Sequence, residues 1–502
     1  MLGVFAIGFP SLYLPFGRDQ GIHAFIAELA GDGFVVYRDV FNVKPPLTTV
    51  IHWLAQILFG ETMRAIRIMD LVLVSATAAM LQKLVQRHLQ SAWLGVVSAV
   101  AFAALHYSND YWHTAQTDGW CNAFVVAAVL LYSHSLDTVS APRRTLLLCS
   151  AGFCVGLSFW LKYTSAVVLM LFPVVHLLYR QPFRRIVFDA AAVATGFAAC
   201  VAAVLLILYA QGALAQFIDI QNFFRSYVGI SKPLSTLLFS PKYALEGAKI
   251  VAIVAALGAY ACVAAILMRM RVVESWALLT WLFLGVVAAL AQGKAFPYHL
   301  LALYPSIAVA AAVGAGVLVS PLRYHGKRRQ EDFAILLLCC AFVGLSDVRR
   351  AYRDILPVAF KDEVTLRAFW EGDQFTEPDF STADNLALVD YLKHETLPCD
   401  RVFIWGYESG VYFMSQRRPV SRFVYNFPMF TSYYRQSYRD EFMTALRANP
   451  PAVFIVQHAD RTPRISGHNR DSAEVFATFE DLRAFVEDRY RPSGSVRRFD
   501  IY

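Results

Sequence analysis

Hydrophobic and polar positions divide the chain into two unequal parts. Up to about residue 346, long apolar runs alternate with short polar breaks, and the sequence beyond is polar. Because an α-helix needs about 20 apolar residues to cross a bilayer, these runs predict membrane-spanning helices. We expect about eleven of them, at residues 1–16, 63–85, 93–107, 119–135, 145–160, 164–179, 186–209, 245–268, 275–291, 299–319 and 333–346.

The predicted fold class is therefore a multi-pass α-helical membrane protein. Residues 1–346 form the predicted transmembrane domain, and residues 347–502 form a separate polar domain. Helical and strand patterns alternate in the polar domain, which is typical of a small α/β domain. We expect its helices at 384–395, 440–448 and 479–490, and its strands at 401–405, 452–457 and 495–502.

The first apolar run is short for its predicted role. At about 1.5 Å per residue, its helix would extend about 24 Å, less than a hydrocarbon core of about 30 Å. Either part of the next segment completes this span, or the N-terminus of the sequence is incomplete.

Two of the polar breaks are long. Residues 17–62 form a predicted first outer loop, in which apolar positions at 21–30 and 47–59 follow a helical spacing. We expect both of these helices to lie at the membrane interface, because neither is long enough to cross it. Residues 211–242 are predicted to be a second outer loop, rich in aromatic residues.

Composition supports the membrane assignment. Of the 502 residues, 57% are hydrophobic and 17% are charged, whereas soluble domains are about 45–50% apolar and about 25% charged. The net charge of +7 could suggest nucleic-acid binding, but its distribution argues against that partner. Half of the basic residues before 347 fall in alternate breaks, namely Arg87, Arg143, Arg144, Arg180, Arg184, Arg185, Arg269, Arg271, Arg323, Lys327, Arg328 and Arg329.

This alternation is the positive-inside pattern of membrane proteins. It predicts a cytoplasmic N-terminus and, with an odd number of spans, an extracytoplasmic polar domain. Ionisable residues on the predicted outer side collect at the ends of the spans, which places them at the depth of a lipid phosphate group. The candidate site residues among them are Arg18, Asp19, Lys44, Arg67, Asp118, Lys294 and His299.

Several of these residues also have a purely structural interpretation. Asp19 and Asp118 each stand where a helix begins and could be N-caps. Arg67 and Asp70 are three positions apart on one helix face, and we expect them to neutralise each other. Lys44 could extend its ammonium group towards water, but Pro45 and Pro46 give it a stiff base, which favours a functional role.

The residues also resemble a known family, the bacterial C-type membrane glycosyltransferases. These enzymes are related to protein O-mannosyltransferases and to the lipid A aminoarabinose transferase. The similar segments are Asp19–Ala27, Tyr37–Phe41, Lys44–Leu47, Phe59–Gly60 with Arg67, Ala115–Asp118, Gly293–Lys294, Tyr298–His299 with Pro305, Arg401–Gly406 and Ser421–Phe423. The resemblance covers nearly the whole chain.

This resemblance implies a sugar donor carried on polyprenyl phosphate and an active site on the extracytoplasmic side of the bacterial plasma (inner) membrane. It also implies that Asp19 is the general base on an acceptor hydroxyl, that Lys44 binds the donor phosphate and that Asp118 is a second important carboxylate. Gln20 departs from the pattern, because many relatives carry a second acid there. This departure argues against a metal site built on residues 19–20. Because the sequence shows no clear set of metal ligands, we expect no metal or other cofactor.

The chemistry of sugar transfer agrees with these residue types. A carboxylate can accept the hydroxyl proton, and cations can stabilise the leaving phosphate; direct displacement would invert the sugar's anomeric centre. We expect Lys294, His299 and Arg225 to assist Lys44 with the phosphate, and Arg18, Arg67 and Tyr298 to support the site. The sequence does not name the sugar or the acceptor, which could be a cell-envelope glycan, lipid A, core oligosaccharide or protein.

Two other functions remain open at this stage. A polysaccharide ligase or polymerase would use similar donors. A transporter of lipid-linked sugars would need no transfer chemistry, but it should show charges in the middle of its spans and broken helices. We expect the protein to act as a monomer, with membrane lipids, the donor and the acceptor as its partners.

Overall fold

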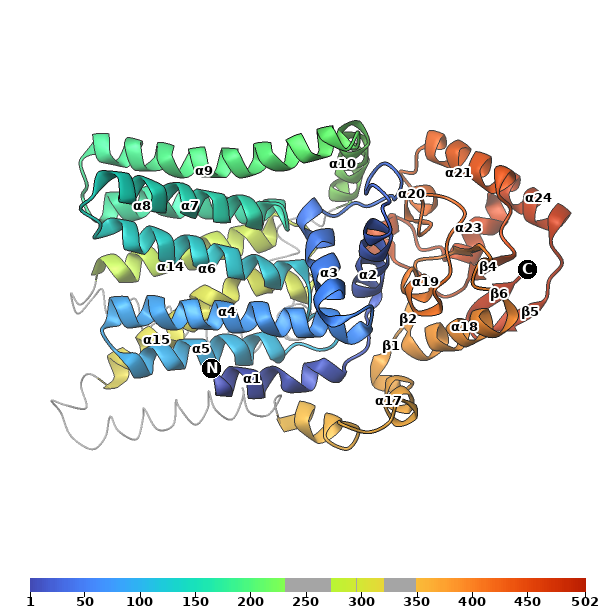
Figure 1. Ribbon diagram of the computed structural model, residues 1–502, viewed down its shortest axis with the longest axis horizontal. Helices are drawn as coiled ribbons and strands as arrows, with labels where there is room; N and C mark the ends of the chain where they lie inside the picture. Colours follow the sequence, from blue (N-terminus) through green and yellow to red (C-terminus); the bar gives the residue numbers. More distant parts are fainter. Residues whose placement is uncertain (231–271, 295, 320–348) are drawn as a thin grey trace.

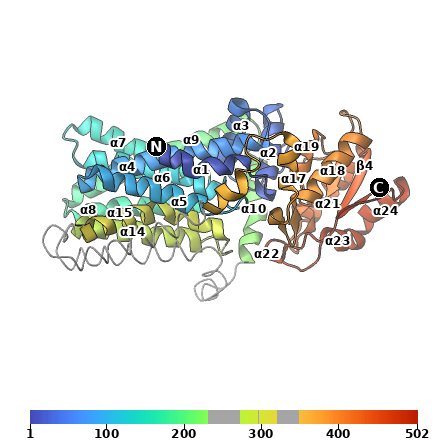
Figure 2. The same ribbon diagram turned by 90° about the horizontal axis from the view of Figure 1, so that it is seen from below.

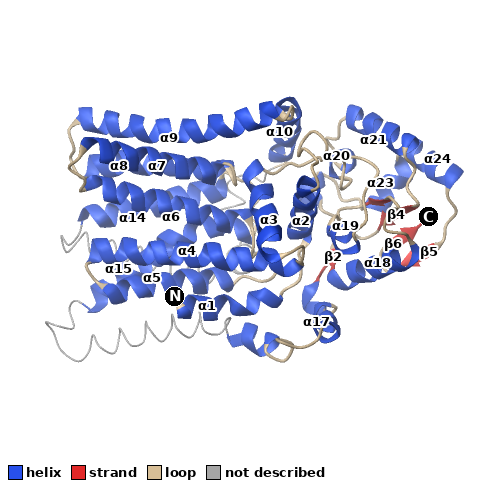
Figure 3. Cartoon of the chain, viewed as in Figure 1, coloured by secondary structure: helices blue, strands red, loops and turns tan. Residues whose placement is uncertain are grey.

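A computed structural model of the protein describes residues 1–230, 272–294, 296–319 and 349–502. Within these ranges the chain forms a bundle of long helices with a C-terminal domain beyond one end of it (Figure 1). The described strands all lie in the C-terminal domain (Figure 3). The predicted spans 245–268 and 333–346, and the last part of the predicted loop 211–242, fall outside the described residues.

Long helices follow most of the predicted spans. They are α4 (Met63–Leu89), α5 (Ala92–Tyr107), α6 (Thr117–Leu136), α7 (Ala141–Phe159), α9 (Phe183–Ala210), α14 (Val272–Leu290) and α15 (Tyr304–Val319). In the described part of the chain, five segments are long and apolar enough to cross a membrane: Met63–Leu89, Thr117–Leu136, Phe183–Ala210, Val272–Leu290 and Pro297–Gly316. The architecture is that of a multi-pass membrane protein.

Several predicted segments differ from the structure. The run 1–16 is not one span but a short helix, α1 (Leu2–Gly8), followed by a 3₁₀ helix, η1 (Phe9–Tyr13). Pro10 explains the change, because a proline cannot donate the backbone hydrogen bond that an α-helix needs at that point. The run 164–179 likewise divides into η2 (Tyr163–Met170) and α8 (Leu171–Leu178).

The third difference is a helix in the predicted loop 211–242, α10 (Leu214–Gly229). Its buried residues, Phe217, Ile220 and Phe223, recur every three positions, which places them on one helix face. The aromatic residues of this segment therefore mark an amphipathic helix rather than an irregular loop.

Two glycines bring α7 and α9 into backbone contact. A Cβ atom on Gly152 would lie 1.9 Å from the carbonyl oxygen of Val193, and one on Gly196 would lie 1.8 Å from the carbonyl oxygen of Cys149. Small residues at such crossings are a common device in membrane proteins, because they let helices approach closely.

We expect Gly196→Ala to lower the free energy of unfolding by about 1–3 kcal/mol, since overpacking at a backbone contact forces the helices apart. Thermal unfolding of the detergent-purified protein measures the change. Gly3→Ala is the matched control, because the nearest atom to a Cβ there is 3.9 Å away. Equal unfolding temperatures for both variants would contradict the assigned packing.

Two shorter helices, α2 (Arg18–Gly31) and α3 (Pro46–Phe59), lie across the end of the bundle and separate it from the C-terminal domain (Figures 1 and 2). Both helices were predicted. On α3, Ile51 and Ala55 are buried while Ile57 and Leu58 are exposed, as expected of an interfacial helix. By contrast, α2 is covered by protein along most of its length, because it packs against α3 on one side and the C-terminal domain on the other.

The C-terminal domain is α/β, as predicted. Its four-stranded sheet has the order β3-β4-β6-β5, in which β3 and β4 are parallel and the other pairs are antiparallel. The strands are β3 (Val402–Trp405), β4 (Val453–Gln457), β5 (Gly494–Val496) and β6 (Phe499–Ile501). The single strand predicted at 495–502 is wrong, because the chain turns at Arg497, whose φ is 55°, and forms a hairpin.

Helices surround this sheet. They are α18 (Thr382–Glu395), α19 (Gly410–Ser415), α20 (Phe427–Phe430), α21 (Gln436–Ala448), α22 (Pro463–Ser466), α23 (Ser472–Thr478) and α24 (Glu480–Arg489). A small antiparallel pair, β1 (Thr376–Glu377) with β2 (Phe380–Ser381), precedes them. The preceding helix α17 (Glu363–Trp370) packs back on η1, where the Trp370 indole donates to the carbonyl of Tyr13 at 2.7 Å.

Candidate active site

Asp19 faces Lys44 where the bundle meets the C-terminal domain. Asp19 is in the first turn of α2, whose N-cap is Gly17, so the N-cap interpretation of Asp19 is wrong. Between Arg18 and Leu29 it is the one residue that is not buried. The Lys44 ammonium lies 3.8 Å from its Oδ2, with 19% of the lysine side chain and 27% of the aspartate side chain exposed. The pair is therefore accessible from outside.

Local contacts hold Lys44 in place. Its backbone N–H donates to the Asn42 side-chain oxygen at 3.0 Å, and its carbonyl accepts from the Tyr37 hydroxyl at 2.8 Å. Pro45 then forms the N-cap of α3 in an extended conformation. These contacts fix the Lys44 backbone and do not involve its ammonium group, which can therefore interact with a ligand.

Burial lowers the pKa of Lys44, the Asp19 carboxylate opposes that shift, and the ammonium of Lys162 adds to it. The positive charge of Lys44 is thus incompletely compensated. An anion arriving beside it would be bound more tightly than at an exposed lysine, because charges interact more strongly where water is scarce.

Asp118 forms a second acid–base pair close by. It lies in the first turn of α6, whose N-cap is Gln116, so Asp118 is not the cap either. Its carboxylate accepts from the Lys162 ammonium at 3.1 Å and from the Gln292 amide at 2.9 Å. Only 1% of the aspartate side chain is exposed. Lys162 and Gln292 were not among the predicted site residues.

We expect Lys162→Met to lower the free energy of unfolding by about 3–5 kcal/mol, because it leaves the Asp118 carboxylate buried without its strongest partner. Adding Asp118→Asn should restore most of the loss, since the double variant has no uncompensated charge. Chemical unfolding in detergent measures all three proteins. An unfolding curve of the single variant that matches the wild type would show that the pair is not needed for stability.

Tyr298 and His299 reach the same region from η3 (Pro297–Leu303), which packs on α6. Both are buried. The Tyr298 ring centroid lies 5.9 Å from the Lys162 ammonium, and the Nδ1 atom of His299 has no hydrogen-bond partner among the described residues. Their predicted place near the charged residues agrees with the structure.

Lys294 is a third lysine of this region, after Lys44 and Lys162. Its ammonium lies 4.1 Å from the centroid of the Tyr227 ring and donates to the Arg464 carbonyl at 3.0 Å. Burial lowers the pKa of Lys294 to about 8. The structure does not bring Arg225 into these contacts. It is exposed on α10, and the aromatic Tyr227 contributes from that helix instead.

Electrostatic effects connect Asp19 with the aromatic residues around it. Burial is the main cause that raises the pKa of Tyr227 and of Tyr425, and the charge of Asp19 raises both further. Tyr425 belongs to the C-terminal domain, so that domain also contributes to the surroundings of Asp19. We refer to Asp19, Lys44, Asp118, Lys162 and Lys294 as the charged cluster.

Arg67, on α4, holds the loop that leads into Asp118. Its guanidinium is fully buried and donates to the carbonyl of Tyr111 and the hydroxyl of Thr114, both at 2.8 Å, and to the Pro15 carbonyl. Arg67 and Asp70 act on each other electrostatically, as expected, but the described contacts of the Asp70 carboxylate are with other side chains. The Asp70 carboxylate accepts a hydrogen bond from the Trp120 indole at 2.9 Å and is hydrogen-bonded to the His106 imidazole at 3.0 Å.

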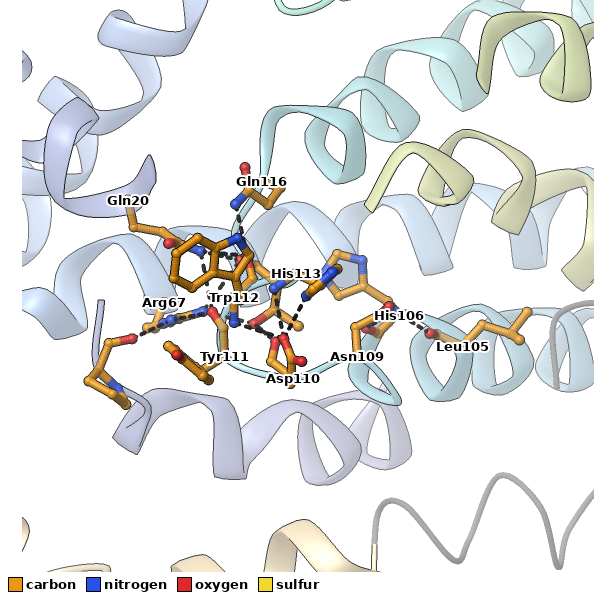
Figure 4. A network of polar contacts seen from close by, with 12 residues as sticks. Gln20, Arg67, Leu105, His106, Asn109, Asp110, Tyr111, Trp112, His113 and Gln116 are labelled. Atoms are coloured by element: carbon orange, nitrogen blue, oxygen red, sulfur yellow. Dashed lines mark hydrogen bonds and ion pairs between the residues drawn. The ribbon is translucent and has the colours of Figure 1, made fainter. Parts of the chain in front are cut away.

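Figure 4 shows the loop that Arg67 holds, residues 109–116 between α5 and α6. Gln20 holds it as well. Its side-chain amide nitrogen donates to the carbonyls of Tyr111, Trp112 and Thr114, at 3.3, 3.2 and 2.8 Å. A carboxylate at position 20 could not make these bonds, because it has no hydrogen to donate. Gln20 thus has a structural role, and the loop it fixes leads directly into Asp118.

No group of three or more His, Cys, Asp or Glu side chains in the described ranges could hold a metal ion. The expectation that no metal is needed stays a prediction. In the charged cluster, Lys44 pairs with Asp19 and Lys162 pairs with Asp118, whereas Lys294 contacts a backbone carbonyl and an aromatic ring. The excess positive charge suits an anionic ligand, and Asp19 is the carboxylate that such a ligand or its reaction partner could reach.

A comparison with known families matches part of the chain. Residues 43–209 match the family model described as dolichyl-phosphate-mannose-protein mannosyltransferase. This range contains Lys44, Asp118 and Lys162, and Asp19 precedes it. No curated protein matches the chain.

Two solved structures of one protein have a similar fold. ArnT from Cupriavidus metallidurans bound to undecaprenyl phosphate matches with a TM-score of 0.58 and 12% identity, over 100% of this chain and 96% of that one. Its apo form gives 0.59 and 12%, over 99% and 95%. The archaeal oligosaccharyltransferase AglB from Archaeoglobus fulgidus, in complex with an inhibitory peptide and a dolichol-phosphate, gives 0.49 and 11%, over 91% and 69%. The resemblance suggested by the sequence is confirmed, at the level of the fold.

Proposed function

We propose that this chain, which has the fold of a C-type membrane glycosyltransferase, moves a sugar from polyprenyl phosphate to an acceptor hydroxyl. One observation carries the proposal: an accessible carboxylate, Asp19, faces a partly buried ammonium, Lys44, at 3.8 Å. This pair lies at the end of a bundle of apolar helices. The family match and the ArnT-like fold support the same reaction class.

In the proposed sugar transfer, the carboxylate of Asp19 and the lysines of the charged cluster have different roles. Asp19 accepts the proton of the acceptor hydroxyl while the hydroxyl oxygen attacks the anomeric carbon of the sugar. The bond from that carbon to the phosphate oxygen breaks, and polyprenyl phosphate leaves. Lys44 and Lys294 neutralise the charge that develops on the phosphate. Attack from the face opposite the leaving group inverts the anomeric centre.

Asp118 has an indirect part in this proposal. Its carboxylate is buried and bonded by Lys162 and Gln292, so it holds Lys162 near the phosphate position. Tyr298 and His299 close the region from the η3 side, and both are buried there. We propose the periplasmic side of the bacterial inner membrane as the place of reaction, a monomer as the active form and a mechanism without metal.

The pH dependence of donor binding tests the role of Lys294. Because its pKa is lowered to about 8, the ammonium is charged below that pH and loses its charge above it. We expect the KM for a polyprenyl-phosphate donor to rise as the pH increases through about 8. Lys294→Arg should remove this rise, because an arginine stays charged at every accessible pH. Identical pH profiles for the two proteins would exclude a charged role for Lys294.

A comparison of cell envelopes tests the function in the native host. We expect one envelope component to lose a single sugar when the gene is deleted, and to regain it with the wild-type gene but not with Asp19→Asn. Mass spectrometry of envelope lipids, glycans and proteins measures the change and names the acceptor. Envelopes that are the same with and without the gene would overturn the proposal.

A further inference from the structure

A buried ion pair connects the C-terminal domain to the residue before Asp19. The Arg18 Nε atom donates to Glu408 Oε1 at 2.9 Å, with 6% and 2% of the two side chains exposed. Arg18 also donates to the Asp379 carboxylate at 2.7 Å and to the carbonyl of the same residue. Every described partner of this guanidinium in an ion pair or hydrogen bond therefore belongs to the C-terminal domain.

Glu408 is itself held firmly. Its second oxygen accepts from the Asn385 amide at 2.9 Å, and its first also accepts from the Gln457 amide at 3.2 Å. Asn385 is on α18, and Gln457 ends β4, the second strand of the sheet. The position of Arg18 is thus set by the sheet and helices of the C-terminal domain.

The backbones of α2 and α19 touch one turn further along. A Cβ atom on Gly21 would lie 2.8 Å from the Cα atom of Gly410, and one on Gly410 would lie 3.1 Å from the Cα atom of Gly21. Beyond this contact, Phe25 stacks on Tyr412 with their ring centroids 5.2 Å apart. These contacts leave little freedom for α2 to move relative to α19.

Helical spacing separates the two roles of α2. Arg18, Gly21 and Phe25 recur at intervals of three and four residues, so they share one face of the helix, and that face docks on the C-terminal domain. Asp19 is one position further around the helix and faces Lys44. A rotation of α2 about its axis would therefore carry the Asp19 carboxylate towards Lys44 or away from it.

We propose that the C-terminal domain positions the general base: Glu408 and Gly410 orient α2 through Arg18 and Gly21 so that Asp19 faces Lys44. This inference rests on the proposed function, because it assigns the base to Asp19. It makes Arg18 and Glu408 positioning residues, which act through Asp19 and touch neither donor nor acceptor. The C-terminal domain then determines the geometry of the active site and does not only shield it from solvent.

Glu408→Gln tests the inference, since Arg18 keeps Asp379 as a partner and is not left with an unpaired charge. A shift of about 1 Å in a catalytic group costs up to about 100-fold in rate, so we expect kcat to fall about 10- to 100-fold. Binding of undecaprenyl phosphate, measured as the probe for the Lys44 side, should stay within about threefold of the wild type. A purely structural role would lower the folded fraction and leave kcat per folded molecule unchanged.

Three further proteins sharpen the test. Gly410→Ala should lower kcat in the same way without changing any charge. The double variant Arg18→Gln with Glu408→Gln should lose no more than the single Glu408→Gln, because the two residues act as one unit. Arg418→Gln is the matched control. It breaks an ion pair between the C-terminal domain and Glu28 at the far end of α2, and we expect its kcat to equal that of the wild type.

The outcomes separate this inference from the proposed function. If Asp19→Asn is inactive while Glu408→Gln and Gly410→Ala retain the wild-type kcat, the positioning inference is wrong and the base assignment stands. If Asp19→Asn itself keeps full activity, the proposed base is wrong and the inference fails with it. A loss of kcat in Arg418→Gln equal to that in Glu408→Gln would also overturn the inference, because the effect would not depend on the contact beside Asp19.

Discussion

Replacing Asp19 with asparagine should lower the kcat of sugar transfer by about 10²- to 10⁴-fold, the usual contribution of a general base. Asparagine has nearly the same shape as aspartate, so the fold around α2 should persist. It cannot accept the proton of the acceptor hydroxyl, and that proton must then pass to water. Because donor binding depends on other residues, we expect the KM for the donor to change little.

The matched control for this variant is Asp32→Asn at the other end of the same helix. Asp32 pairs with Arg418 at an exposed position, and surface ion pairs of this kind contribute about 0–1 kcal/mol to stability. We expect that control to transfer sugar at the wild-type rate. Full activity of Asp19→Asn in folded protein would remove Asp19 from the mechanism.

Replacing Lys44 with methionine should have the second largest effect. Methionine keeps the aliphatic length and removes the charge, so the contacts of Tyr37 and Asn42 with the Lys44 backbone remain. Loss of a single group that stabilises a developing negative charge costs about 10²- to 10³-fold in rate. We expect that loss in kcat/KM, together with weaker binding of undecaprenyl phosphate.

Undecaprenyl phosphate serves as a probe because it is the product common to donors of this kind, whatever sugar they carry. Native mass spectrometry of the purified protein measures its binding. Lys83→Met is the control, an exposed lysine on α4 outside the charged cluster. Equal retention of the probe by the Lys44 and Lys83 variants would show that Lys44 does not bind the phosphate.

The apolar runs were sufficient to locate α4, α6, α9 and α14, because crossing a membrane requires length and hydrophobicity that few other structures share. They could not resolve the break at Pro10, where one residue divides a short run into two helices. They also missed α10, whose aromatic residues were interpreted as a loop because Gln216, Asp219 and Gln221 interrupt the hydrophobic run.

The sequence revealed those candidate site residues that are ionisable, stand at the end of a predicted span and match a segment of the known family. Lys162 was not among the predicted site residues, because its pairing with Asp118 is a contact across helices that the sequence does not show. The same holds for Arg18 and Glu408, which are 390 positions apart. Arg67 and Asp70 do act on each other electrostatically, but their hydrogen-bond partners come from other elements, which the helical spacing could not show.

Release of free polyprenyl phosphate tests the central claim most directly. The purified protein in detergent is given lipid-linked sugars from the native host's membranes and an envelope fraction from host cells that lack the gene. A transporter would give no signal in this assay, because it does not cleave the donor and because no membrane separates two compartments. We expect the wild type to release polyprenyl phosphate in step with sugar gained by the acceptor fraction, and Asp19→Asn to release almost none. No release by the wild type, or equal release by both proteins, would contradict the account.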